Sequence, residues 1–138
     1  MSNVLISVDK LTVRFSQDGV VNDTVNQVSF AIEAGQCVGL VGESGSGKSM
    51  TALAMMQLLP NAARVSASSS IMMHGEDLLQ YSQRQIRKVR GGRIAMVFQD
   101  ASTALNPVKT VAQQIKEVLQ LHTTLTTLQI KNRIIHLL

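Results

Sequence analysis

The segment 42–49, Gly-Glu-Ser-Gly-Ser-Gly-Lys-Ser, constrains the fold of this chain more than any other feature. It completes the pattern G-x-x-x-x-G-K-S, in which Gly42 and Gly47 let the backbone wrap closely around a phosphate that a Cβ would keep away. A short apolar run, residues 36–41, precedes the loop, and residues 50–59, rich in helix formers, follow it and stop at a proline. Strand, glycine loop and helix in this order predict an α/β core that binds a nucleotide through its phosphates.

The spacing within the loop predicts a chemical role for most of its positions. Backbone amides from about Gly45 to Ser49 are expected to point at a β-phosphate, where the N-terminus of the following helix adds partial positive charge. The Lys48 ammonium can reach the β and γ oxygens, and the Ser49 hydroxyl can ligate Mg²⁺. The tip of the loop holds residues whose side chains can face water: Glu43, Ser44 and Ser46. The chain is therefore predicted to bind a nucleoside triphosphate together with Mg²⁺.

Length and composition agree with one domain inside the cell. The chain has 138 residues, of which 45% are hydrophobic, enough to bury a single core. No segment approaches the ~20 apolar residues of a membrane span, and the first residues lack the basic start and apolar stretch of a signal peptide. The lone cysteine, Cys37, lies in the apolar run before the loop, so we expect it to be a buried small hydrophobe rather than a reactive thiol.

The net charge of +4, from 13 basic and 9 acidic residues, is concentrated in one segment. Five of the basic residues lie close together: Arg84, Arg87, Lys88, Arg90 and Arg93. Such a cluster can indicate nucleic-acid binding, but the chain has no Trp, one Tyr and three Phe, so stacking platforms for bases are scarce. We interpret the cluster as a solvated helix face or a contact surface for another protein, and we expect no nucleic-acid partner.

The residues before the loop are patterned as antiparallel strands. Strands are predicted at residues 4–8 and 11–15, and Asp18-Gly19 is a turn signal. Residues 28–32 alternate large apolar and small side chains, as in a half-buried strand. The chain then turns into residues 36–41, which are predicted to form a buried strand. An antiparallel β-rich start is thus expected to lead into the α/β core.

The residues after the first helix are patterned as a loop, strands and a basic helix. Residues 61–70, which include four serines, are predicted to be a loop, and residues 71–74 a short strand. Ser82-x-x-Gln85 is a capping-box signature for a helix that crosses the basic cluster and ends at Gly91-Gly92. Residues 93–98 are strongly apolar and are predicted to be a second core strand.

Two further helices are predicted at the end of the sequence. Thr110-x-x-Gln113 opens the first, whose apolar stripe is Val111, Ile115, Val118 and Leu119. Thr126-x-x-Gln129 opens the second, and no Gly, Asn or Pro stops it. Its apolar residues run to the last position, with little to pack on: Ile130, Ile134, Ile135, Leu137 and Leu138. We therefore expect this sequence to be the amino-terminal piece of a longer domain.

Two stretches together resemble one known family. Residues 41–49, with the Asp-Gly hairpin before them, and residues 98–107, which begin Phe-Gln-Asp, are similar to ATP-binding subunits of ABC transporters. The sequences of these two stretches are similar to the oligopeptide and dipeptide uptake branch, which also serves nickel and glutathione. The resemblance covers essentially the whole chain. It implies an ABC-type nucleotide-binding domain of the P-loop NTPase class, with an antiparallel β subdomain and a truncated helical subdomain.

The resemblance also implies roles for particular residues. Phe15 matches the aromatic residue that stacks on adenine; otherwise it is a strand phenylalanine of the core. Gln99 matches the glutamine that helps to ligate Mg²⁺ with Ser49, orients water and relays the state of the transporter. Lys48 and Gln99 are the catalytic candidates. The implied nucleotide-binding residues are Phe15, Gly42, Glu43, Ser44, Gly45, Ser46, Gly47, Lys48, Ser49 and Met50.

Several motifs of the family do not occur in residues 1–138. The signature Ser-Gly-Gly-Gln, the second acidic (Walker B) motif with its catalytic Glu, and the switch His are absent, and Gly91-Gly92 is not the signature. The full-length protein is expected to hydrolyse ATP for solute import, with peptides as the expected solute, and this piece alone to hydrolyse little. The implied partners are permease subunits and a second ATP-binding subunit, at the cytoplasmic face of the inner membrane.

Two other functions are compatible with parts of the sequence. In a complete, smaller phosphate-loop enzyme, residues 94–98 would be the strand of the second motif and Asp100 the Mg²⁺ carboxylate. Gln99 and the uncapped last helix argue against that arrangement. A non-catalytic regulatory or nucleic-acid-binding module would rest on net charge alone.

Overall fold

The computed structural model describes residues 3–17, 19–99 and 104–138. The chain divides into two compact units, Met1–Ile86 and Arg87–Leu138. Each unit is described by itself below.

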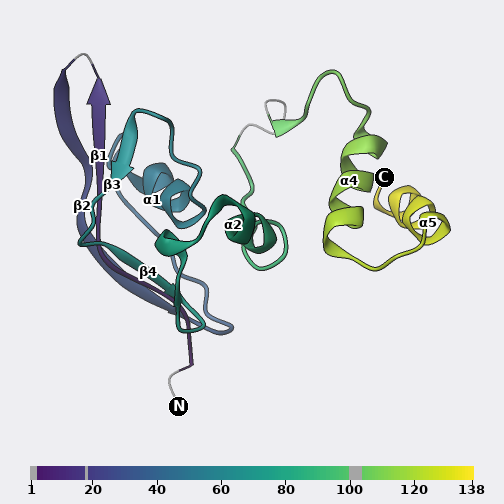
Figure 1. The fold of residues 1–138 in the computed structure, drawn as a ribbon, viewed down its shortest axis with the longest axis horizontal. Coiled ribbons are helices and arrows are strands. Elements are labelled where there is room, and N and C mark those ends of the chain that lie inside the picture. The colour runs from purple at the N-terminus through teal and green to yellow at the C-terminus, as the bar shows by residue number, and fades with distance from the viewer. Residues whose placement is uncertain (1–2, 18, 100–103) are drawn as a thin grey trace. The chain divides into compact units, whose positions relative to one another are not determined.

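The first unit is built on an antiparallel sheet of five strands (Figure 1). Two long strands form a hairpin, β1 (Val4–Gln17) and β2 (Val20–Glu33). Three short strands follow: β3 (Ala63–Val65), β4 (Ser70–Met73) and β5 (Glu76–Asp77). The order is β2-β1-β4-β5, and β3 also pairs with β1. Helix α1 (Lys48–Met55), the 3₁₀ turn η1 (Leu78–Gln80) and helix α2 (Gln83–Val89) complete the helical elements of this part of the chain.

The hairpin confirms the predicted antiparallel start. The predicted strands 4–8 and 11–15 are one continuous strand, and Val28, Phe30 and Ile32 are half-buried as the alternation predicted. Gly19, at φ 79°, lies in the turn between the strands, while its predicted partner Asp18 lies outside the described residues. A second tight turn joins β4 to β5 through His74 and Gly75, at φ 50° and 83°, where the sequence predicted the chain to turn.

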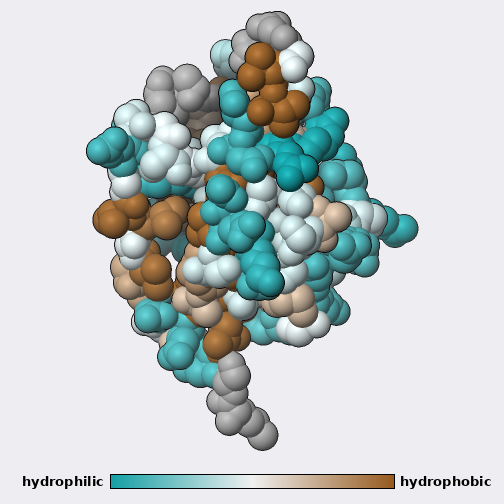
Figure 2. Space-filling model, turned by 90° about the vertical axis from the view of Figure 1, so that its left-hand side faces the viewer, coloured by the Kyte–Doolittle hydropathy of each residue, from teal (hydrophilic) through white to brown (hydrophobic). Residues whose placement is uncertain are grey.

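The core of this unit is formed by the sheet together with α1, η1 and Ile86 of α2. Its fully buried side chains are Val8, Leu11, Val13, Ile71, Leu78 and Ile86. Leu11 and Val13 lie two residues apart on one face of β1, and the register shift between Val8 and Leu11 lets Val8, three residues earlier, be buried as well. From the side of the hairpin, the surface is mostly polar with separate apolar patches (Figure 2). The apolar pattern of β1 thus places one face of the sheet inside.

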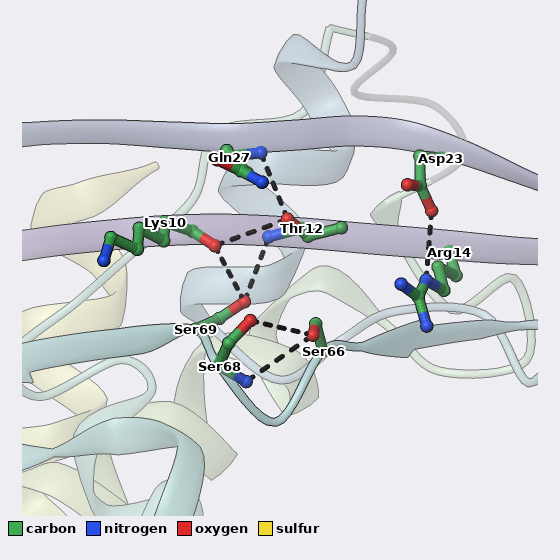
Figure 3. A network of polar contacts seen from close by, with 8 residues as sticks. All are labelled: Lys10, Thr12, Arg14, Asp23, Gln27, Ser66, Ser68 and Ser69. Carbon is green, nitrogen blue, oxygen red and sulfur yellow. Dashed lines mark hydrogen bonds and ion pairs between the residues drawn. The ribbon is translucent and has the colours of Figure 1, made fainter.

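Where the pairing of the hairpin is irregular, near its middle, β1 is hydrogen-bonded to Ser69 of the serine-rich segment 66–70. The register shifts between Val8 and Leu11, where Lys10 has φ 46°. The Ser69 hydroxyl accepts from the Thr12 amide at 3.0 Å and donates to the Lys10 carbonyl at 3.1 Å (Figure 3). The Thr12 hydroxyl in turn accepts from the Gln27 amide at 3.1 Å. Hydroxyl groups therefore satisfy backbone atoms that the bulged ladder leaves aside.

The predicted loop at residues 61–70 is partly wrong. Its residues Ala63–Val65 form β3, which pairs with Val13, Arg14 and Phe15 of β1. The segment shows little strand pattern by itself, and pairing with the long β1 decides its conformation. β-propensity is weak where a neighbouring strand supplies the hydrogen bonds.

Helix α1 ends earlier than the sequence predicted. It was expected to reach residue 59, but it ends at Met55, and Gln57 has φ 51°. The Gln57 amide donates to the Ala54 carbonyl and the Leu58 amide to the Leu53 carbonyl, the paired bonds of a Schellman cap. The Gln57 carboxamide also donates to the carbonyls of Leu78 and Tyr81. These tertiary bonds hold a non-glycine residue in a conformation that usually favours glycine.

Both predicted core strands, 36–41 and 93–98, are wrong for this structure. Residues 36–41 form no strand, Val41 is 91% exposed and Cys37 is exposed rather than buried. Residues 93–98 make only one bridge, between Arg90 and Ile94, and Val97 is 96% exposed. A strand needs a neighbour to receive its backbone hydrogen bonds, and none of the described strands runs beside either segment.

The second unit contains the two helices predicted from capping boxes. α4 spans Val111–His122 and α5 spans Thr127–Leu137, and both boxes are formed, at Thr110 with Gln113 and at Thr126 with Gln129. Ser82 and Gln85 likewise bond each other's backbone amides at the start of α2. Among the described residues, no helix is long and apolar enough to cross a membrane.

The apolar faces of the last two helices are covered unequally. Ile130 and Ile134 of α5 are buried, so the expectation that they lack cover is wrong. Ile135, Leu137 and Leu138 are exposed, as expected. On α4, Ile115 and Leu119 are half-buried, while Val111 and Val118 face solvent. The two helices pack on each other through part of their predicted stripes.

The basic cluster agrees with a solvated helix face. Arg84, Arg87, Lys88 and Arg93 are exposed. Arg90 is half-buried, and burial, with the nearby charge of Arg87, lowers the pKa of its guanidinium. Mutual repulsion among these cations is mild because most of them keep their water.

Candidate phosphate-binding site

The glycine loop folds back on itself before it enters α1. The Ser46 amide donates to the Glu43 carbonyl at 3.2 Å, which closes a turn at the tip. A Cβ at Gly42 would lie 2.6 Å from the Ser46 hydroxyl oxygen across the loop. This approach is closer than real Cβ atoms make, so a side chain at the first glycine of the pattern would displace the Ser46 hydroxyl from the inside of the loop.

The last glycine of the loop begins the helix. Gly47 is buried, has φ 88° and is the N-cap of α1. Its carbonyl accepts from the Thr51 amide at 2.8 Å and from the Thr51 hydroxyl at 3.0 Å, which are the first bonds of the helix. A left-handed residue at this position turns the chain sharply from the loop into the helix axis.

Lys48 lies at the centre of the loop. Its ammonium donates to the Gly42 carbonyl at 2.7 Å, the Glu43 carbonyl at 2.6 Å and the Ser46 hydroxyl at 3.2 Å. These partners line the inside of the turn, so the positive charge lies within the loop. Three oxygen atoms of the loop thus accept hydrogen bonds from the Lys48 ammonium and hold it inside the turn.

The N-terminus of α1 is open to an anion. In the described structure no side chain caps it, and its first turn contains no acidic residue. The amides of a first helical turn have no partner within the helix, and their partial positive charge attracts anions. Ser49, in this turn, is exposed, and Met50 is half-buried. Glu43, Ser44 and Ser46 are exposed as well, as predicted for the tip.

Phe15 lies on β1 in the same unit. It pairs with Asn22 of β2 on one side and Ala63 of β3 on the other, and it is half-buried. Two residues before it on the strand, Val13 pairs with Val25, whose side chain lies against the position of Gly47. A half-buried ring leaves part of its face available for stacking, and it is equally compatible with an ordinary role in the sheet, so the stacking role stays a prediction.

Gln99 belongs to the other unit, Arg87–Leu138, and is exposed. Asp100, the Mg²⁺ carboxylate of the alternative enzyme, lies outside the described residues, as do Ala101, Ser102 and Thr103 of the similar segment. The structure therefore brings together Phe15 and the loop within one unit. The metal roles of Ser49 and Gln99 stay predictions.

Sequence reasoning missed two residues next to the loop, Thr24 and Val25. A Cβ at Gly47 would meet the Thr24 carbonyl oxygen at 2.5 Å and the Val25 Cγ2 at 2.9 Å. The predicted strand covered only residues 28–32, although the pairing of two long strands about the Asp-Gly turn would have brought residues 20–25 into β2.

Comparisons with known proteins agree with this geometry. The sequence profile of the family described as ABC transporter matches residues 25–137. The chain is 47% identical over 122 residues to the ABC transporter ATP-binding protein YejF of Escherichia coli (strain K12), covering 88% of this chain and 23% of that protein. It is 42% identical over 118 residues to the dipeptide transport ATP-binding protein DppD of the same organism, covering 86% of this chain and 36% of the relative.

A second YejF, the peptidoglycan transport ATP-binding protein of Agrobacterium fabrum (strain C58 / ATCC 33970), is 44% identical over 134 residues, which cover 97% of this chain and 24% of the relative. The chain thus spans about a quarter to a third of the length of these curated relatives.

Among solved structures, the dimeric post-hydrolysis state of the ATP-binding cassette MJ0796, bound to ADP and Pi, superposes with a TM-score of 0.79. The match has 18% sequence identity and covers 95% of this chain and 54% of that chain, so it supports the fold. The loop that closes around Lys48, the antiparallel sheet behind it and the match over residues 25–137 lead to one conclusion: the chain belongs to the ABC transporter family.

Proposed function

We propose that this chain supplies the amino-terminal part of an ABC ATP-binding domain and contributes the phosphate-binding half of an ATP site. One observation carries the proposal: the loop 42–47 closes around the Lys48 ammonium at the uncapped N-terminus of α1. Cation, loop amides and helix dipole converge there on one small space, which is the arrangement that binds polyphosphates.

The residues present fit ATP and Mg²⁺. The cradle at Gly42 and Gly47 would be filled by any Cβ, and Lys48 is placed to exchange its carbonyl contacts for phosphate oxygens. Ser49 would hold Mg²⁺ with Gln99, and Phe15 would stack on the base. When bound, Mg²⁺ would supply positive charge that offsets the charge of the phosphate oxygens.

The full-length protein would use this site to energise solute import. Relatives named for dipeptide and oligopeptide transport support peptides as the solute. The dimeric cassette MJ0796 supports a second ATP-binding subunit as partner, and permease subunits would place the protein at the cytoplasmic face of the inner membrane. ATP hydrolysis would need an oriented water and a base, which the motifs absent from residues 1–138 supply in the family.

Nucleotide titration tests the proposal. Amide signals of residues 42–50 should shift when Mg²⁺–ATP is added, and adenosine, which lacks phosphates, should shift them far less. Lys48→Ala should weaken ATP binding about tenfold or more, since one charge-assisted contact is worth about 1.5–3 kcal/mol. Lys109→Ala, which removes an exposed lysine paired with Glu117, is the matched control and should change nothing. Equal ATP affinity in the Lys48 and Lys109 variants would contradict the phosphate-loop assignment.

A further inference from the structure

Strand β2 reaches the phosphate loop at one point, the last glycine. A Cβ at Gly47 would lie 2.5 Å from the Thr24 carbonyl oxygen and 2.9 Å from the Val25 Cγ2. The first distance is to backbone, which cannot move aside as the end of a flexible side chain can. The Thr24 carbonyl and the Val25 side chain therefore lie directly behind Gly47, although they precede it by more than twenty positions. We call these two groups the wall.

A bulge in β2 shapes this wall. Val13 pairs with Val25, but the next residue of β1, Arg14, pairs with Asp23. Thr24 is thus the extra residue between two pairs, and a bulge bends the strand and redirects its backbone groups. Beyond the bulge, the Arg14 guanidinium donates to the Asp23 carboxylate at 3.2 Å (Figure 3). The ladder resumes through Phe15 and Asn22.

Packing holds the wall in place. Val25 is 4% exposed, and its cross-strand partner Val13 is 0% exposed. Because protein interiors are close-packed, a side chain as buried as Val25 cannot move aside, and it fixes the position of the backbone that it contacts. On the other side of Gly47, its carbonyl accepts the first amide bond of α1 from Thr51. Gly47 therefore lies between the wall and the start of the helix.

We propose that the bulge at Thr24 and the side chain of Val25 position the N-terminus of α1, with Val25 as the positioning residue of the phosphate loop. The wall holds Gly47 in its left-handed conformation and thereby orients the amides of Lys48 and Ser49. The consequence for nucleotide binding rests on the proposed function, but the effect on the helix start does not.

Hydrogen exchange in the whole 138-residue chain tests the positioning directly. The Thr51 amide, bonded to Gly47, reports the start of α1, and the Gln57 amide, bonded to Ala54, reports its end. Val25→Ala should raise the ratio of Thr51 to Gln57 exchange rates by roughly tenfold, since local opening is independent of global unfolding. Val8→Ala, which removes the same atoms from a buried valine of β1 that pairs with Phe30 and not with Val25, should leave the ratio unchanged. Val25→Thr keeps the branched shape, with its hydroxyl oxygen in the position of the valine Cγ2, and should restore it.

A ratio that is the same in the two alanine variants would overturn the inference, because Val25 would then act only through overall stability. ATP titration provides a second measurement: Val25→Ala should weaken binding more than Val8→Ala does. If the unmodified chain failed to bind ATP, the proposed function would fall, while the exchange ratio would still decide the role of Val25.

Discussion

At the scale of single residues, the loop shows how backbone geometry selects its glycines. At Gly42 a side chain would displace the Ser46 hydroxyl across the loop, and at Gly47 it would meet the Thr24 carbonyl, which is backbone. The first constraint is local and is contained in the pattern of residues 42–49. The second depends on a strand distant in sequence, so the pattern alone gives no sign of it.

Phe15 offers the sharpest residue test of the base site. Phe15→Ala should weaken ATP affinity by roughly 1–3 kcal/mol through lost stacking, with little discrimination between bases. Phe30→Ala, on β2 and also half-buried, is the control and should leave affinity near that of the unmodified chain. Calorimetric titration of both variants measures the difference. Unchanged affinity in Phe15→Ala would return the ring to an ordinary role in the sheet.

Gln99 and Asp100 separate the importer subunit from the smaller phosphate-loop enzyme. If the chain is part of the proposed importer subunit, Gln99→Ala in the complete subunit should lower Mg²⁺-dependent ATP turnover, and Asp100→Asn should be mild, because Gln99 is the proposed ligand. The smaller enzyme would reverse that order, since Asp100 would hold the metal. Turnover measured across a Mg²⁺ titration for both variants distinguishes the two functions.

At the scale of elements, sequence patterns were most reliable where a structure is closed by near neighbours. The three capping boxes, at Ser82, Thr110 and Thr126, all formed because each joins residues three positions apart. The end of α1 was wrong because Gln57 is held by carbonyls more than twenty residues away. Strand β3 was missed for the same reason: its pairing with β1 lies beyond any local pattern.

One serine of the predicted loop 61–70, Ser69, stabilises the sheet through hydrogen bonds to β1. Ser69 is 6% exposed and joins the Thr12 amide to the Lys10 carbonyl. Ser69→Ala should lower the free energy of unfolding by about 1–3 kcal/mol, because the buried Thr12 amide loses its acceptor. Ser68→Ala, at an exposed neighbour, should cost within about 0.5 kcal/mol. Urea unfolding of the two variants checks the contrast, and equal midpoints would contradict it.

At the scale of the whole molecule, the described chain exposes two apolar segments that the sequence predicted to be core strands. Residues 36–41 and 93–98 have the continuous apolar character of strands buried on both faces. The composition of these residues is that of a buried strand, but a strand forms only beside a neighbouring strand that receives its backbone hydrogen bonds. The antiparallel sheet, by contrast, could be predicted because its hairpin is local.

These exposed segments should make the isolated chain marginal and prone to self-association. Each large uncovered side chain forgoes about 1.5–3 kcal/mol of burial, against a stability of about 5–15 kcal/mol for a typical domain. Sedimentation should show mass rising with concentration, and thermal melting should be broad. ATP with Mg²⁺ should shift the midpoint little, since even a hundredfold excess over Kd adds only about 2.7 kcal/mol. A sharp melt of a monomer that turns over ATP would favour the smaller enzyme.

The long hairpin also has a consequence for the order of folding. β1 and β2 are complete by Glu33, and a short turn joins them, so their contacts close early, within microseconds for typical hairpins. During synthesis at roughly 5–20 residues per second, that pairing can be tried before Gly47 has been added to the chain. The nascent chain would then contain the Thr24 bulge and the Val25 side chain, which position the N-terminus of α1, before Gly47 has been synthesised.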